Sequence, residues 1–145
     1  MNDAMSDTQS LLKAAAIVVH ELAHVETALA AAARAGQALV LLSPRGASAY
    51  MGAGYFRAMI ETGRRMHPAA EAVAVLDCGD RAGDAMGALR EGIEVVCFRG
   101  DPAVATKLAE MAAQSGAAVI EVRPDAIDLA GVDDAANACR TWLNK

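Results

Sequence analysis

The chain has 145 residues, of which 54% are hydrophobic, 21% charged and 3% aromatic, and its net charge is −5. This composition indicates one folded domain with an aliphatic core and excludes a disordered chain. The acidic balance, without a basic cluster, argues against nucleic acid as a partner.

The cysteines and the first residues indicate the compartment. Cys78, Cys97 and Cys139 are odd in number and form no C-x-x-C pair, so we expect no disulfide framework and a cytoplasmic location. The N-terminus lacks the charged and apolar regions of a secretory signal, and no apolar run reaches the about 20 residues of a membrane span. We therefore expect no membrane partner.

Short apolar runs alternate with alanine-rich amphipathic segments along the chain. The runs cover residues 15–19, 38–43, 72–77, 94–99 and 117–122. They are continuous rather than alternating, which is typical of strands buried on both faces of a parallel sheet. The intervening segments predict helices, and residues 132–143 predict a last one. We expect residues 1–10 to be frayed or disordered and residues 11–145 to form a single α/β domain.

Capping residues support these boundaries. Glycine stands between a predicted helix and the next strand at Gly36, Gly92 and Gly116. Asp101 followed by proline predicts a helix N-terminus, and Asp80 is expected to cap a helix over residues 81–91.

Residues 20–24 read His-Glu-Leu-Ala-His, the H-E-x-x-H string of zinc peptidases. On a helix, the two histidines would share a face and could bind one zinc ion. The β-branched run before His20 instead predicts a strand, with the helix beginning near Leu22. His20 and His24 would then not share a helical face, and no third ligand follows at a usual spacing. We interpret the string as a coincidence in a strand-to-helix turn.

The middle of the chain resembles the first half of class II fructose-bisphosphate aldolases. The similarity is carried by "LVLLSPRGASAYMGAGYFRAMI" and "AVAVLDCGDRAGDAMGALREGIEVVCFRGD", and it extends over about residues 11–122. In that family, the third strand ends in Leu-Asp-His-Gly, whose Asp is the catalytic acid/base and whose His binds zinc. The resemblance thus implies Asp77 as the catalytic residue and places Cys78 at the metal-ligand position.

Several departures from the family indicate that activity is lost. Val75 and Arg99 replace a frequent histidine and the Asp of Asp-Gly-Ser, and the family barrel has eight strands where this chain has five predicted ones. A closed barrel of this kind needs about 200 residues or more. We therefore expect a catalytically inactive aldolase-like domain without a cofactor, although a thiolate can bind zinc. The alternatives are an aldehyde-lyase that completes its metal site between subunits, and a structural or interaction module.

Ligands of parallel α/β sheets bind at the carboxyl ends of the strands, where helix N-termini also point. The residues expected there are His20-Glu21, Ser43-Pro44-Arg45-Gly46, Asp77-Cys78-Gly79-Asp80, Arg99-Gly100-Asp101 and Arg123-Pro124-Asp125. Arginine and glycine favour a small anionic ligand such as a phosphorylated metabolite. We predict that its binding residues are Ser43, Arg45, Gly46, Arg99, Gly100 and Arg123.

Two architectures are compatible with the predicted elements. One is an incomplete TIM-barrel-like sheet with sequential strand order, and the other is a flavodoxin-like three-layer sandwich of order 2-1-3-4-5, which we favour for a monomer. The barrel piece would leave one apolar face of its sheet uncovered, which is unusual for a soluble monomer. We therefore expect a homodimer.

Overall fold

The computed structural model describes residues 3–145, which form one sheet and its covering helices. The strands are β1 (Ala15–Val18), β2 (Leu39–Leu42), β3 (Ala72–Asp77), β4 (Val95–Cys97), β5 (Ala118–Ile120) and β6 (Ala126–Asp128). All neighbouring strands are parallel, in the order β5-β4-β3-β2-β1-β6. This confirms the α/β class and the predicted strands, and it adds β6, which was not predicted.

Within residues 3–145, six helices accompany the sheet. They are α1 (Asp3–Leu11), α2 (Leu22–Ala35), α3 (Ala53–Met66), α4 (Ala82–Glu91), α5 (Pro102–Gln114) and α6 (Ala135–Leu143), with a short 3₁₀ turn η1 (Ala47–Ala49) before α3. The segment expected to be frayed thus contains α1, while residues 1 and 2 lie outside the described residues.

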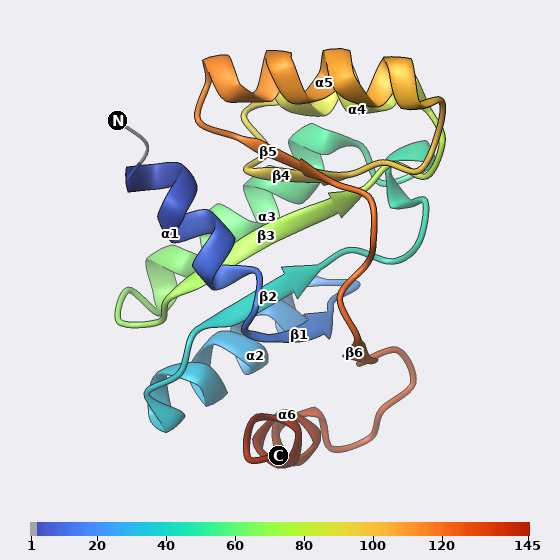
Figure 1. Cartoon of the computed structure of the whole chain (residues 1–145). Helices are drawn as coiled ribbons and strands as arrows, with labels where there is room; N and C mark the ends of the chain where they lie inside the picture. Colours follow the sequence, from blue (N-terminus) through green and yellow to red (C-terminus); the bar gives the residue numbers. More distant parts are fainter. Residues whose placement is uncertain (1–2) are drawn as a thin grey trace.

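The strand order is that of the barrel piece, while helices on both faces of the sheet give the three layers of a sandwich. Strands β1 to β5 lie in chain order, as in a barrel piece, and the flavodoxin-like order 2-1-3-4-5 is not formed. Because right-handed crossovers that always advance in one direction place their helices on the same face, α2 to α5 share one side. In Figure 1, α2 and α3 lie behind the sheet and α1 lies in front of it.

Each face of the sheet has its own apolar cluster. In β2, Leu39 and Leu41 pack with the helices on what we call the outer face, and Val40 and Leu42 belong to the cluster on the inner face. All four side chains are fully buried. Burial on both faces explains why the strand sequences are continuously apolar.

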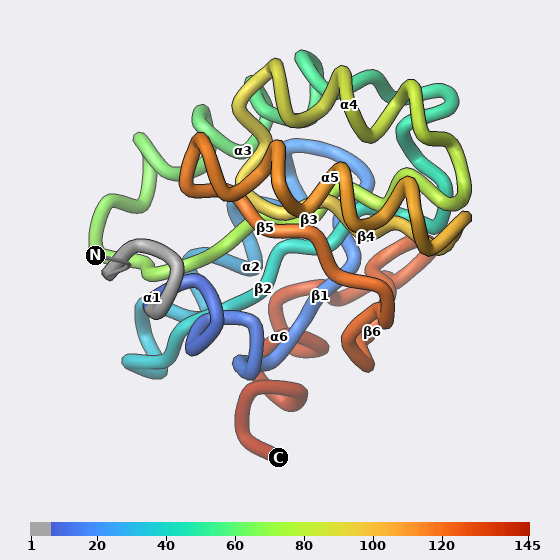
Figure 2. Tube along the Cα trace, turned by 45° about the horizontal axis from the view of Figure 1, so that its top comes forward, coloured from blue at the N-terminus to red at the C-terminus, as the bar shows by residue number. Residues whose placement is uncertain are grey.

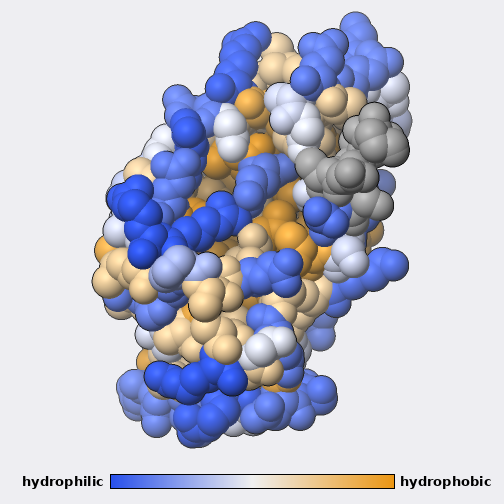
Figure 3. All heavy atoms as spheres, turned by 90° about the vertical axis from the view of Figure 1, so that its left-hand side faces the viewer, coloured by the Kyte–Doolittle hydropathy of each residue, from blue (hydrophilic) through white to orange (hydrophobic). Residues whose placement is uncertain are grey.

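The inner face is covered within the chain itself. Leu11, at the end of α1, and the following Leu12 and Ala14 pack against its cluster, in which no side chain is more than 9% exposed. Figure 3 shows a different side of the molecule, at the amino ends of the strands, where some hydrophobic side chains reach the surface among hydrophilic ones. The expected homodimer loses its main physical reason, an exposed inner face, and stays a prediction.

The connection from β5 to β6 is the least expected part of the fold. Figures 1 and 2 show the chain running between these strands without a helix. Residues 121–125 form this link, which leads from one edge of the sheet to the other. Beyond β6, helix α6 packs on α2 and returns to the outer face.

The helix boundaries follow most of the predicted caps. Asp101 accepts hydrogen bonds from the backbone N–H groups of Ala103 and Val104, and the predicted glycines follow α2, α4 and α5. The prediction for Asp80 was wrong, because α4 begins at Ala82 and the residue at its N-cap is Arg81. The last helix begins at Ala135 rather than at 132, since Asp134 caps it by accepting from the N–H of Asn137.

Candidate functional site

The carboxyl ends of the parallel strands all lie at the same end of the sheet. The registers pair Val18 with Leu42, Leu42 with Val75, and Asp77 with Cys97. The loops that follow β1 to β4 therefore start side by side at the same end of the sheet, as the parallel pattern predicted. The candidate site lies at these carboxyl ends.

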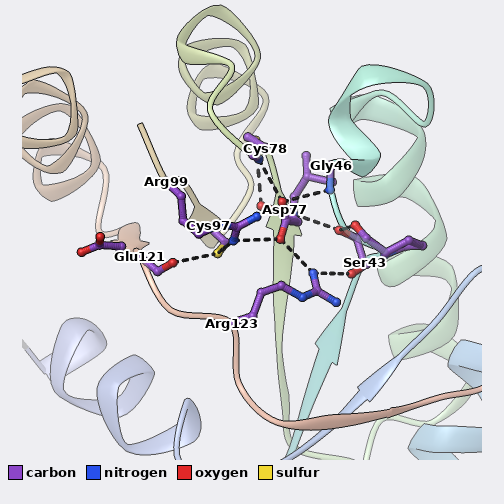
Figure 4. A network of polar contacts seen from close by, with 11 residues as sticks. Ser43, Gly46, Asp77, Cys78, Cys97, Arg99, Glu121 and Arg123 are labelled. Carbon is purple, nitrogen blue, oxygen red and sulfur yellow. Dashed lines mark hydrogen bonds and ion pairs between the residues drawn. The ribbon is translucent and has the colours of Figure 1, made fainter. Parts of the chain in front are cut away.

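Asp77, the last residue of β3, lies at the centre of a polar network (Figure 4). Its Oδ1 accepts from the backbone N–H groups of Gly46, at 3.0 Å, and Gly79, at 2.9 Å. Its Oδ2 lies 2.9 Å from Nη1 of Arg123 and 3.4 Å from Nη1 of Arg99. The carboxylate is fully buried and both of its oxygens are engaged.

The pKa of Asp77 is lowered although the residue is buried. Burial by itself raises the pKa, but the hydrogen bonds from Gly46, Arg123 and Gly79 and the charge of Arg99 outweigh it. The carboxyl group is therefore ionised at neutral pH. An ionised, enclosed carboxylate between two guanidinium groups is suited to hold those groups in place.

Ser43 ties the end of β2 to this network. Its hydroxyl accepts from the backbone N–H of Asp77 at 2.8 Å and donates to the carbonyl of Pro44 at 3.0 Å. The carbonyl of Ser43 accepts from Nη1 of Arg123 at 3.0 Å. One nitrogen of Arg123 thus bonds to the residue after β2 and to the last residue of β3, although Arg123 comes from the link after β5.

Two glycines allow the loops to turn their N–H groups toward Asp77. Gly46 and Gly79 have φ angles of +63° and +55°, in the left-handed region that glycine enters without strain. Both N–H groups bond to the same carboxylate oxygen. A side chain at either position would strain the loop that forms the network.

The thiols beside Asp77 are buried and protonated. Cys78 lies on the outer face, where burial raises its pKa to about 11, and burial also raises the pKa of Cys97 on the inner face. Within residues 3–145, no group of three or more His, Cys, Asp or Glu side chains is placed to hold a metal ion. The surroundings of Cys78 therefore do not fit the zinc ligand that the aldolase resemblance implied.

A hollow of about 410 Å³ opens next to the network. Its lining comes from β1, from the loop after β2, from the link and from β6: Val18, Arg45, Arg123, Pro124, Asp125, Ala126 and Asp128. The volume falls within the about 300–1,000 Å³ that small-molecule sites occupy. Arg123 is shared, since its Nη1 bonds to Asp77 and its side chain also lines the hollow.

The predicted binding residues divide into three groups. Ser43, Gly46, Arg99 and Arg123 converge on Asp77, as described above. Arg45 lies outside the network and lines the hollow. Gly100 lies apart from both, beside Phe98, whose ring would be 2.4 Å from a Cβ at this position. Its role is thus explained by packing.

The H-E-x-x-H string forms a turn, as the β-branched residues before it predicted. Helix α2 begins at Leu22, and the N-cap is Glu21 in an extended conformation. Nδ1 of His24 accepts from the backbone N–H of His20 at 3.0 Å, and Nε2 of His20 lies 2.6 Å from Oδ1 of Asp128. The string therefore fastens β1 to α2 and to β6.

Sequence reasoning missed β6 and the carboxylate at its end. The strand has three residues, too few for a periodic pattern, and it follows Pro124 closely. The signal that could have located it is the run Ala126-Ile127-Asp128-Leu129 between Pro124 and Gly131.

No protein-family model matches this chain, and no curated protein matches it. Among the described residues, no helix is long and apolar enough to cross a membrane.

Proposed function

We propose that this chain is a catalytically inactive, aldolase-like α/β domain that binds a small phosphorylated ligand in the hollow at the carboxyl ends of its strands. The observation that carries the proposal is the position of Arg123. Its guanidinium is fixed by Asp77 and by the carbonyl of Ser43, and the same side chain lines the hollow together with Arg45.

Fixing the guanidinium in advance favours binding. Arg123 has a side chain only 10% exposed, and within residues 3–145 its Nε and Nη2 donate no hydrogen bond to the protein. These groups are available for an anion, and less side-chain entropy is lost on binding because the arginine is already ordered. Arg45 supplies a second, exposed guanidinium from another loop.

The same network supports the absence of catalysis. A general acid or base must exchange a proton with the ligand, yet both oxygens of Asp77 already accept hydrogen bonds from the protein. The side chain of Cys78 packs in the apolar cluster on the outer face of the sheet and does not belong to the network around Asp77. Asp77 as an acid/base stays a prediction from the resemblance, and we propose instead that it positions Arg123.

Another hollow of about 410 Å³ lies between α2 and α6 and provides a control. It is lined by Arg34 and Arg140 together with alanines of both helices. Nη2 of Arg140 donates to Oδ1 of Asn137, but among the described residues neither arginine forms an ion pair with a carboxylate, as Arg123 does with Asp77. Arg34→Ala removes the same charge as Arg45→Ala at a position that is also exposed.

The test is isothermal calorimetry with ethyl phosphate at low ionic strength. We expect binding to the wild-type protein that weakens with added salt, a loss of about 10-fold in affinity in Arg45→Ala, and no change in Arg34→Ala. Absence of binding at millimolar ligand, or equal losses in both variants, would contradict the proposal.

A further inference from the structure

The hollow contains charges of both signs that do not neutralise one another. Arg45 and Arg123 line it together with Asp125 and Asp128. Arg123 is paired with Asp77, and Asp128 lies against His20. Within the described part of the chain, neither Arg45 nor Asp125 forms an ion pair, although both line the same hollow. Among the described residues, the hollow is therefore lined by one unpaired arginine and one unpaired aspartate.

The carboxylates retain acceptor positions for a ligand. Asp128 uses one oxygen for both of its contacts, since Oδ1 accepts from the N–H of Ala130 at 2.9 Å and lies 2.6 Å from Nε2 of His20. Within residues 3–145, its Oδ2 has no hydrogen-bond partner, and neither has the side chain of Asp125. His20 thereby holds the carboxylate of Asp128 in one orientation.

The backbone of the link is restrained at the residues that bring opposite charges to the hollow. Arg123 precedes a proline, which restrains it to an extended conformation, and Pro124 has a fixed φ angle. Asp125 is two residues after Arg123 and directly before β6, whose Ala126 pairs with Ala16. An arginine and an aspartate are thus presented on one short, restrained segment anchored at both ends.

We propose that the ligand is a zwitterion that carries a phosphate and an ammonium group separated by a few carbon atoms. This inference rests on the proposed function, since Arg45 and Arg123 would bind the phosphate. Asp125 and Oδ2 of Asp128 would accept hydrogen bonds from the ammonium group. Val18, Pro124 and Ala126 offer an apolar lining for the short carbon chain between them.

The experiment compares three probes of nearly equal size by calorimetry. O-phosphoethanolamine carries the ammonium group, 2-hydroxyethyl phosphate replaces it with a hydroxyl, and ethyl phosphate lacks both. We expect O-phosphoethanolamine to bind about 5-fold more tightly than ethyl phosphate, because the carboxylates are partly exposed and charge-assisted hydrogen bonds at such sites are modest. Asp125→Asn should remove most of this advantage, measured as the ratio of the affinities for O-phosphoethanolamine and ethyl phosphate within each variant.

The outcomes separate the two proposals. Asp133→Asn removes one exposed carboxylate outside the hollow and should preserve the preference. Equal affinity for the three probes would overturn the zwitterion and leave the phosphate site standing. A preference for 2-hydroxyethyl phosphate that disappears in Asp125→Asn would show that a hydroxyl is recognised and would also overturn it. If no probe binds, both proposals fail.

Discussion

Replacement of Arg123 by alanine tests the network at the carboxyl ends of the strands. The change removes the closer of the two guanidinium groups from Asp77, which is fully buried, and leaves Arg99 at 3.4 Å. Removing one partner of a buried ion pair costs about 3–5 kcal/mol, because the remaining charge stays desolvated. Since Arg99 and two backbone N–H groups remain, we expect the free energy of unfolding to fall by about 2–3 kcal/mol.

Urea denaturation followed by circular dichroism measures this loss, with Arg45→Ala as the control. Arg45 is exposed and unpaired among the described residues, so its replacement should change the free energy of unfolding by less than about 0.5 kcal/mol. A double-mutant cycle with Asp77→Asn isolates the coupling between the two side chains. A loss below about 1 kcal/mol in Arg123→Ala would refute the view that this ion pair holds the link on the sheet.

The pH dependence provides a second check on the same network. The folded-state pKa of Asp77 lies below its ordinary value of 3.8, so its contribution to stability is complete above that value. The contribution is lost as the pH falls through the folded-state pKa. Arg123→Ala should bring that pKa nearer to the ordinary value. The stability difference between wild type and variant should therefore shrink in acid, and a constant difference would contradict this explanation.

Three further predictions concern packing, thiols and metal. Gly63→Ala should lower the free energy of unfolding by about 1–2 kcal/mol, because the added Cβ would lie 2.4 Å from Cγ1 of Val25. Gly87→Ala on α4 is the matched control. Its Cβ would meet nothing within 4 Å, so the free energy of unfolding should rise by about 0.5–1 kcal/mol. The three cysteines are fully buried, so we expect Ellman's reagent to react slowly with the native protein and at once in denaturant; rapid native labelling would contradict their burial. We expect no stoichiometric zinc by elemental analysis and no cleavage of fructose 1,6-bisphosphate. A single bound zinc that is lost in Cys78→Ser would overturn this prediction.

The resemblance to class II aldolases stays a proposal about kinship. The sequential strand order and the position of Asp77 at the end of β3 are compatible with it. Two features differ from the family. The surroundings of Cys78 do not fit a metal ligand. After β5, a barrel would add further helices and strands beside β5, whereas here β6 pairs with β1.

The sequence alone determined most of the helices, five of the strands and the residues at the carboxyl ends of those strands. Continuous apolar runs are buried on both faces, so the strands were recognisable without knowledge of their neighbours. Parallel strands bring their carboxyl ends together, and this rule alone predicts that Ser43, Gly46, Arg99 and Arg123 lie at the same end of the sheet as Asp77. The turn at His20 followed from local preferences, since β-branched residues precede it.

Tertiary structure decided the order of the strands, the cover of the inner face and the lining of the hollow. The order of the strands depends on how the apolar faces of the strands and helices pack together. Residues far apart in the sequence take part in this packing, so a local pattern does not predict it. β6 has three residues, and its pairing with β1 brings Asp128 to His20, 108 positions away. Arg45 and Asp125 line one hollow only because the link leads from one edge of the sheet to the other. No local sequence pattern predicts the course of this link, because that course depends on the free energy of the whole fold.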